Sequence, residues 1–213
     1  MRGQFYIDKN RDYDKAFADF DRAIELDFKN ASAYMVRGEN YYTRALLRYK
    51  DGRNDDQTKE YFSRAKTDLD KAVELNPIYA SQVAVIYTDM GTINRSVADL
   101  TKAVELNPNS FNIYFQQGRF FMDRKDYDKA IDNFDKAIEI NPNNSYPFEN
   151  RGWCYFSKQN YDLALDDYNT AIKISPTNAS AYTKRAKLYD KTGKKDLARQ
   201  DINRAARLQG FQE

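Results

Sequence analysis

Very few side chains in this sequence could perform chemistry. The 213 residues include no histidine and a single cysteine, Cys154. Without histidine, the commonest general base and the commonest metal ligand are missing, and no Ser/His or Cys/His pair can form. The segment Asp8–Asp12 resembles a calcium-binding loop, but Tyr13 stands where such a loop needs glycine. We therefore expect no enzyme activity, no metal and no cofactor, and we expect Cys154 to be an inert buried thiol.

Charge and hydropathy exclude two further classes of partner. The chain has 34 basic and 32 acidic residues, a net charge of +2, whereas a nucleic-acid binder concentrates basic residues on its surface. No apolar run approaches the roughly 18 residues of a membrane-spanning helix. Residues 1–6 lack an apolar signal core, and one cysteine fits a reducing compartment. We expect a cytoplasmic protein with no nucleic-acid partner and no direct membrane insertion, while a signal or anchor outside this segment stays open.

An internal repeat organises the whole chain. An alanine recurs shortly before each Glu-Leu-Asn-Pro-like ending, and its last three intervals are 34 residues each. A small residue stands seven positions before this alanine, and a large residue stands three positions before it. Such spacings of four and three place all three residues on one face of an α-helix. The alanines are Ala23, Ala72, Ala103, Ala137, Ala171 and Ala205, and the large residues are Phe20, Leu69, Leu100, Phe134, Tyr168 and Ile202.

A second helix precedes each of these helices. Its small residue is followed three positions later by an aromatic residue, and Asn-rich segments such as Asn141–Ser145 supply turn and capping chemistry between units. Proline stands five positions after the repeated alanine in four units and ends the helix there. A lone helix pair cannot bury its apolar faces, whereas stacked pairs share one continuous core. The small residues are Gly3, Gly38, Ala84, Gly118, Gly152 and Ala186.

The unit resembles the tetratricopeptide repeat, a helix–turn–helix of 34 residues. It shares with that repeat an aromatic residue, Gly, Tyr, Ala, a large residue, Ala and Pro, in that order. Tyr127–Pro142 comes close to the family's pattern. The resemblance covers nearly the whole chain and implies an all-α, right-handed α-solenoid of stacked antiparallel helix pairs. We expect six repeats, the first lacking the first half of its first helix, over residues 1–30, 31–76, 77–110, 111–144, 145–178 and 179–213.

Two of the six units depart from the pattern. The second carries about fifteen extra residues, in which Thr43–Lys50 continues a helical pattern and Asp51–Asp56 forms a polar turn. We expect a projecting hairpin of two helices, each longer by about two turns. The third unit fits best with Ala84 in the small column and Gly91 at the turn, so we expect a shortened connection near Pro77, with about three residues missing there. The first helix of this unit should then be short at its start, or it should pack against the neighbouring unit at an altered angle.

The ends of the chain raise the expectation of further contacts. Gly3 already stands in the small column, and the chain stops soon after the last expected helix. Repeat arrays usually need capping repeats with a polar outer face. We therefore expect a fragment of a longer protein, or ends that pack against other chains.

The resemblance also implies a binding site. In tetratricopeptide arrays the first helix of each repeat lines a concave groove that holds partner peptides. Aromatic and arginine side chains supply many binding hot spots, and Trp153 is the only tryptophan of this chain. The groove positions expected to bind the partner carry Glu39, Tyr42, Phe115, Arg119, Met122, Asn150, Trp153, Phe156, Lys184, Lys187 and Lys191.

Simpler explanations compete with this site. Packing of Trp153 and Phe156 against the adjacent first helix would account for both aromatic residues. An ordinary solvated face would account for the stripe of lysines at residues 184, 187 and 191. One family subtype binds chaperone C-termini through a carboxylate clamp, but only two of the five clamp positions match here, so that partner is disfavoured.

Three binding functions remain open. The leading hypothesis is a protein–protein interaction scaffold that holds a partner peptide or helix in the groove. The alternative is self-assembly through the open ends and the projecting hairpin, which would make a homo-oligomer. An RNA-binding array of similar helix pairs would need a basic groove and a recurring pair of base-reading residues, which Tyr42, Phe115 and Trp153 fit poorly.

Overall fold

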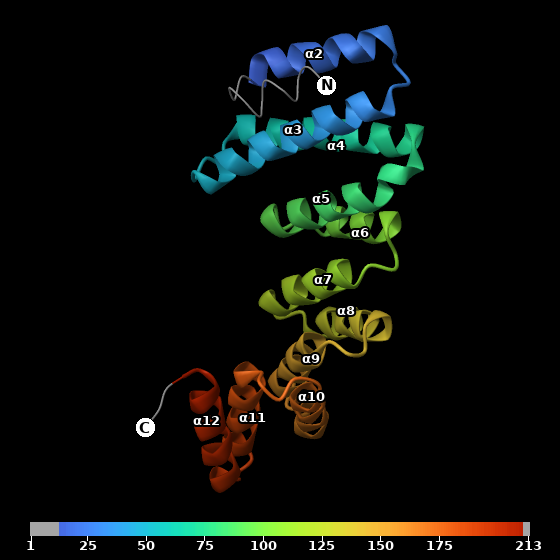
Figure 1. Cartoon of the computed structure of the whole chain (residues 1–213). Coiled ribbons are helices and arrows are strands. Elements are labelled where there is room, and N and C mark those ends of the chain that lie inside the picture. The colour runs from blue at the N-terminus through green and yellow to red at the C-terminus, as the bar shows by residue number, and fades with distance from the viewer. Residues whose placement is uncertain (1–12, 211–213) are drawn as a thin grey trace. The chain divides into compact units, whose positions relative to one another are not determined.

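The computed structural model describes residues 13–210, so Gly3 and the Asp8–Asp12 segment lie outside the described residues. Across that range the structure consists of helices and short turns, without a strand. The chain divides into two compact units, which we call unit 1 (Met1–Asn107) and unit 2 (Pro108–Glu213). Each unit contains antiparallel helix pairs, which confirms the all-α prediction (Figure 1).

In unit 1, α3 pairs with α4 and α5 pairs with α6, while α2 packs against α3. A single 3₁₀ turn, Pro77–Tyr79, leads into α5. The side chain of Asn30 caps α3 by accepting a hydrogen bond from the backbone N–H of Ala33, as expected for an Asn-rich connection. The helices are α2 (Tyr13–Leu26), α3 (Ala31–Lys50), α4 (Asp56–Leu75), α5 (Ala80–Ile93) and α6 (Val97–Leu106).

Unit 2 stacks three antiparallel pairs in chain order, α7 with α8, α9 with α10 and α11 with α12. Asn144 and Asn178 cap α9 and α11 by accepting hydrogen bonds from backbone N–H groups. The helices are α7 (Phe111–Asp123), α8 (Tyr127–Ile140), α9 (Ser145–Ser157), α10 (Tyr161–Ile174), α11 (Ala179–Lys191) and α12 (Lys195–Leu208). The regular spacing gives the three first helices of this unit equivalent positions.

The α3–α4 pair is longer than its neighbours in unit 1. Each of its helices has 20 residues, against 14 in α5 and 10 in α6. The joined ends of α3 and α4 extend past the end of α5 (Figure 1). Leu47 and Tyr49 near this end are 48% and 37% exposed. These helix lengths agree with the projecting hairpin expected from the sequence, while the division into six repeats stays a prediction.

The pair of α5 and α6 departs from its expectation at the turn. Helix α5 begins at Ala80, four residues before Ala84, whereas α7 begins at Phe111, seven residues before Gly118, so α5 is short at its start in the expected register although its 14 residues exceed the 13 of α7. Gly91 lies inside α5, and the turn falls at Asn94–Ser96 instead. A Cβ atom on Gly91 would lie 2.7 Å from Cγ of Leu100, so glycine is needed where the two helices meet. Helix α6 is short as well, with 10 residues against 14 in α8.

The repeated large residue forms the core of both units. This residue is at most 3% exposed at five of its six occurrences, Phe20, Leu69, Leu100, Phe134 and Tyr168. The sixth, Ile202 of α12, is 55% exposed, and no described helix follows α12. Close approach of paired helices depends on the small column, because a Cβ atom on Gly118 would lie 2.5 Å from the ring of Phe134. The predicted pattern of small against large residues therefore describes the helix contacts.

Half-buried arginines join successive helices. In unit 2 the guanidinium of Arg151 on α9 donates through two nitrogens to Asp167 of α10, at 2.9 and 2.6 Å, and also bonds Asp135 of α8. Arg185 of α11 makes the same double contact with Asp201 of α12, at 2.8 Å for both bonds. The planar fork of arginine matches a carboxylate in this two-point geometry.

Unit 1 has the same arrangement. Arg37 of α3 donates to both oxygens of Asp68 at 2.7 Å and to Asp21 of α2 at 2.6 Å. The carboxylates hold the pKa of Arg37 above its ordinary value, although burial acts in the opposite direction. We call these three groups the arginine clamps. They fix each first helix against the second helices on either side.

Candidate partner-binding site

The first helices of unit 2, α7, α9 and α11, are neighbours, because α9 contacts each of the other two. We call the surface that they share the first-helix face. Nine of the eleven predicted site residues belong to these helices; they are Phe115, Arg119, Met122, Asn150, Trp153, Phe156, Lys184, Lys187 and Lys191. The structure brings three of the nine, Trp153, Phe156 and Lys187, into direct contact.

Trp153 and Phe156 form an aromatic pair on α9. Their ring centroids are 5.4 Å apart and their planes differ by 25°. The ammonium of Lys187 on α11 lies over the indole, 5.6 Å from its centroid, in a cation–π contact. Phe156 also meets the ring of Tyr161 on α10, at 5.8 Å between centroids. Trp153 thus contacts the adjacent first helix through Lys187, and both rings of the pair stay only half-buried.

Glu149 joins α9 to α11. Its side chain is 4% exposed and accepts hydrogen bonds from Asn178 (2.7 Å), Ser180 (2.6 Å) and the ammonium of Lys184 (2.6 Å). Burial alone would raise the pKa of Glu149, but the attraction of Lys184 and the three hydrogen bonds outweigh it and hold the pKa below its ordinary value. Lys184, predicted as a contact for the partner, is therefore already paired within the protein.

Helix α7 adds further aromatic surface next to α9. The ring of Phe115 stacks on Phe111, with centroids 5.7 Å apart and planes 10° apart, and lies 6.5 Å from the ring of Tyr146. Tyr146 opens α9 and is 57% exposed. Its backbone carbonyl accepts a hydrogen bond of 2.8 Å from the side-chain amide of Asn150. One N–H of that amide is therefore bonded within its own helix.

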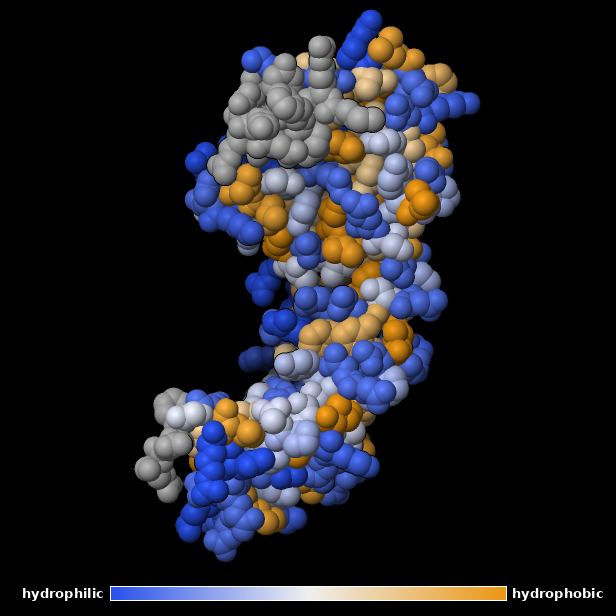
Figure 2. Space-filling model, viewed as in Figure 1, coloured by the Kyte–Doolittle hydropathy of each residue, from blue (hydrophilic) through white to orange (hydrophobic). Residues whose placement is uncertain are grey.

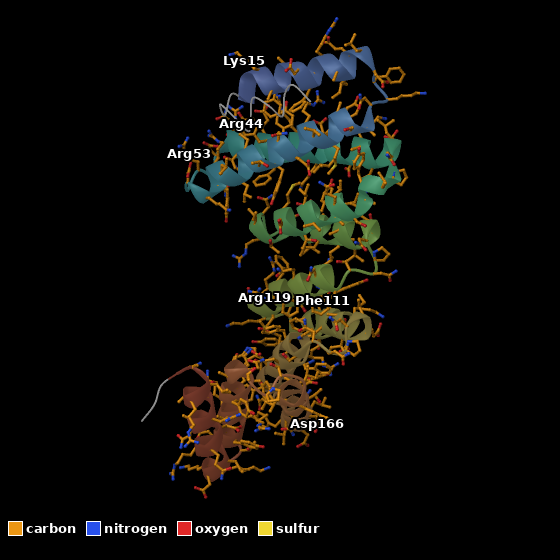
Figure 3. The ribbon with its side chains drawn as sticks, in the orientation of Figure 1. Lys15, Arg44, Arg53, Phe111, Arg119 and Asp166 are labelled. Carbon is orange, nitrogen blue, oxygen red and sulfur yellow. The ribbon has the colours of Figure 1, made fainter. Side chains whose placement is uncertain are left out.

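Two exposed cations belong to the helices of the first-helix face. Arg119 extends from α7 (Figure 3), and Lys191 ends α11. Neither has a hydrogen bond or an ion pair with the residues that the structure describes. Two exposed carboxylates, Asp123 and Asp190, stand in the same helices, so the face is of mixed charge. Met122, next to Asp123, is half-buried.

The other two predicted residues, Glu39 and Tyr42, belong to unit 1. The hydroxyl of Tyr42 on α3 donates to Asp89 of α5 at 3.1 Å, and Glu39 accepts a hydrogen bond from Gln82 of α5. Burial raises the pKa of both Glu39 and Tyr42. They line a hollow of about 320 Å³ between α3 and α5. Both side chains therefore take part in holding these two helices together.

The arginine clamps were not predicted, although the sequence carries a signal for them. Arginine stands directly before the small residue at Arg37, Arg151 and Arg185. Aspartate stands directly before the large residue of the second helix, as at Asp68 and Asp167. A search for arginine directly before the small residue and aspartate directly before the large residue would have identified the arginine clamps. The same applies to Glu149, which the sequence analysis did not place among the binding residues.

Two further findings concern Cys154 and possible metal ligands. Cys154 is fully buried, as expected, and burial raises the pKa of its thiol to about 12, so the thiolate is scarce at neutral pH. Within residues 13–210 no three or more Cys, Asp or Glu side chains gather as metal ligands would. No helix in that range has both the length and the apolar character needed to cross a membrane.

Comparison with sequence families finds repeat models along most of the chain. Models described as tetratricopeptide repeat match residues 111–144, residues 133–166 and, for a third model, residues 1–30, 81–110 and 179–211. A model described as TPR repeat matches residues 154–193. The matched ranges leave out residues 31–80, which contain the long helices α3 and α4. No curated protein matches the sequence.

Several solved structures have a similar fold. A crystal structure of MamA is 25% identical, with a TM-score of 0.59 over 72% of this chain and 92% of that one. YrrB, described as a TPR protein with an unusual peptide-binding site, is 20% identical, with a TM-score of 0.61 over 90% and 92%. MamA from Desulfovibrio magneticus RS-1, from residue 41 to its end, is 14% identical, with a TM-score of 0.61 over 83% and 97%. At 20% and 14% identity, the last two similarities speak for the fold alone.

Proposed function

The chain belongs to the tetratricopeptide repeat family, and from that membership we propose that it is a protein-interaction scaffold whose first-helix face in unit 2 holds a segment of a partner protein. Fold membership does not by itself assign a function, so the proposal depends on the site. The observation that carries it is the half-buried aromatic pair of Trp153 and Phe156, with Lys187 placed over the indole. An aromatic platform of this kind is typical of binding hot spots.

The surroundings of the pair support a preorganised site. Glu149 and its three donors fix α9 against α11, and the Arg151 clamp fixes α9 against α8 and α10. Side chains held in this way lose little freedom when a partner binds, which lowers the cost of association. Tyr146, 57% exposed, extends the apolar contact surface along α9. We propose that an apolar side chain of the partner packs on Trp153 and Phe156.

We propose that binding, rather than catalysis, is the role of this chain. The absence of histidine and the burial of Cys154, which raises the pKa of its thiol, support that choice. The charge balance of 34 basic and 32 acidic residues supports a protein partner over a nucleic acid. A cytoplasmic location, proposed here, rests on the single cysteine, which fits a reducing compartment.

Capture of partners by the wild-type chain and by Trp153→Ala tests the proposal. A protein retained by wild type should be lost from the variant, or should bind at least about ten-fold more weakly, because truncating a hot-spot tryptophan removes most of its packing. Leu163→Ala is the matched control, since Leu163 is 48% exposed and belongs to the second helix α10 rather than to a first helix. Equal helical circular dichroism must accompany the loss. If Trp153→Ala and Leu163→Ala retain the same proteins, the binding site lies elsewhere.

A further inference from the structure

A second candidate site lies in unit 1, at the hollow of about 320 Å³ between α3 and α5. Two hydrogen bonds connect the helices there. The side-chain amide of Gln82 donates to the carboxylate of Glu39. The hydroxyl of Tyr42 donates to Asp89 at 3.1 Å. Along α5, Ile86 stands between Gln82 and Asp89, so the hollow opens between the two bonds. The residues that line it are Glu39, Asn40, Tyr42, Thr43 and Ile86.

The two carboxylates at the hollow have no cation. Glu39 is half-buried and Asp89 is exposed, and neither forms an ion pair with the residues that the structure describes. Burial raises the pKa of Glu39, because it disfavours the charged form. By contrast, each of the five buried carboxylates in the described chain pairs with an arginine or a lysine. These pairs are Asp68 with Arg37, Asp99 with Lys66, Glu149 with Lys184, Asp167 with Arg151, and Asp201 with Arg185.

Helix α5 supplies no basic side chain to the hollow. It contains neither lysine nor arginine, and Asp89 is its only charged residue. Gln82 stands two residues before the small residue, in the column where α11 has Lys184. In unit 2 that lysine reaches the neighbouring first helix and neutralises Glu149. In unit 1 the neutral amide of Gln82 takes its place, so Glu39 keeps a negative charge that a ligand could neutralise.

Asn40 adds a buried acceptor to the same hollow. The residue is 6% exposed, and its side-chain N–H donates to the backbone carbonyl of Val36 at 2.7 Å. Because a carbonyl can only accept, this bond identifies the other end of the amide as its oxygen. That oxygen has no hydrogen bond with the residues that the structure describes. A buried oxygen without a donor is costly, so the hollow favours a ligand that donates.

Apolar surface adjoins these acceptors. Ile86 forms the apolar part of the lining, and Val85, next to it on α5, is 53% exposed. Figure 2 shows both hydrophobic and hydrophilic residues at the surface over α3 and α5. A long basic side chain matches this mixture, because its stem is apolar and its head is a charged donor. A metal ion fits less well, since no three acidic side chains gather as metal ligands within residues 13–210.

We infer that the hollow between α3 and α5 binds a basic side chain, lysine or arginine, of a partner protein. The cationic head lies between Glu39 and Asp89 and donates to the side-chain oxygen of Asn40. The aliphatic stem packs on Val85 and Ile86. The ligand thus supplies the ion pair that Glu39 lacks within its own unit. This site is separate from the first-helix face of unit 2, and neither proposal depends on the other.

Three acetylated and amidated tripeptides, Gly-Lys-Gly, Gly-Arg-Gly and Gly-norleucine-Gly, test the inference. Each is titrated into the isotopically labelled full chain while NMR follows the backbone amides. The lysine or the arginine peptide should cause saturable shifts centred on Glu39 and Asp89, and comparison of the two identifies the preferred head group. The norleucine peptide keeps the apolar stem without the charge and should bind about ten-fold or more weakly. Equal binding of the norleucine peptide, or no saturable shift with either basic peptide, would overturn the inference.

A variant of the protein assigns the effect to this hollow. Glu39→Gln removes the charge but keeps an acceptor for Gln82, so it should weaken binding of the basic peptides about ten-fold or more with an unchanged helical spectrum. Glu105→Gln, at an exposed carboxylate of α6, is the matched control and should bind as wild type does. Equal binding by wild type and Glu39→Gln, or an equal loss in Glu105→Gln, would contradict the assignment. The same shifts on adding magnesium chloride alone would show a metal site instead of a site for a basic side chain.

Discussion

At the scale of single residues, the ion pair of Glu149 and Lys184 gives the clearest prediction. The carboxylate is nearly inaccessible, while the lysine side chain is 22% exposed. Glu149→Gln removes the charge but keeps an acceptor for Asn178 and Ser180, so we expect a loss of about 1–3 kcal/mol in the free energy of unfolding. Lys184→Met should cost more at neutral pH, because it leaves a buried carboxylate with neutral donors only. Urea unfolding of the two variants and wild type measures both effects.

The pH dependence of the same variants provides the control. The pKa of Glu149 is lower in the folded chain than its ordinary 4.5. A group with a lowered folded pKa stabilises the fold above its unfolded pKa and loses that contribution as the pH falls through the folded value. The stability difference between wild type and Glu149→Gln should therefore be full at pH 6–7 and should shrink below about pH 4.5. A difference that stays constant down to pH 3 would contradict a charged Glu149 in the folded state.

At the scale of the element, the contact between paired helices depends on the absence of a side chain in the small column. A Cβ atom on Gly118 would lie within 3 Å of three ring atoms of Phe134. Alanine favours a helix by about 1 kcal/mol over glycine, but overpacking a core costs about 1–3 kcal/mol. We expect Gly118→Ala to lower the midpoint of urea unfolding despite its better helix propensity. Phe134→Leu in the same chain should recover part of the loss, and purely additive effects would argue against a steric cause.

Helix positions could be predicted from the sequence wherever the packing columns are unambiguous. The pairs from α7 onward follow the 34-residue period, and the inserted segment of α3 and α4 shows a helical pattern of its own. The prediction that Gly91 stands at the turn is wrong, because Gly91 lies inside α5, seven residues after Ala84, and the turn falls at Asn94–Ser96. Seven residues make nearly two helical turns, so both stand on the same face and fit the same column. Only the close approach of Gly91 to Leu100 in the structure shows that Gly91 lies where the two helices meet.

The site was predicted less completely than the fold, for a physical reason. A column pattern reports which face a residue occupies, and it placed Trp153, Phe156 and Lys187 on one face. It does not report which charges neutralise each other. Lys184 therefore entered the predicted set although Glu149 pairs with it, and Asn150 entered although its amide bonds to its own helix. Such contacts depend on side-chain geometry between helices, which spacing along the chain leaves undetermined.

At the scale of the whole molecule, the division into two units predicts that unit 2 folds by itself. Its three helix pairs reach the roughly three repeats that a stacked array needs, and the Arg151 and Arg185 clamps and the Glu149 bonds close within it. We expect residues 108–213 to give a helical circular dichroism spectrum and one cooperative thermal transition. Residues 145–213, with two pairs, should melt at a lower temperature.

The same fragment connects stability with function. If the first-helix face of unit 2 is the binding surface, residues 108–213 should retain the partner captured by the full chain, and Trp153→Ala in the fragment should release it. A fragment that melts without cooperativity would show that unit 2 needs residues 1–107 for its stability. A folded fragment that loses the partner would instead place part of the binding surface in unit 1.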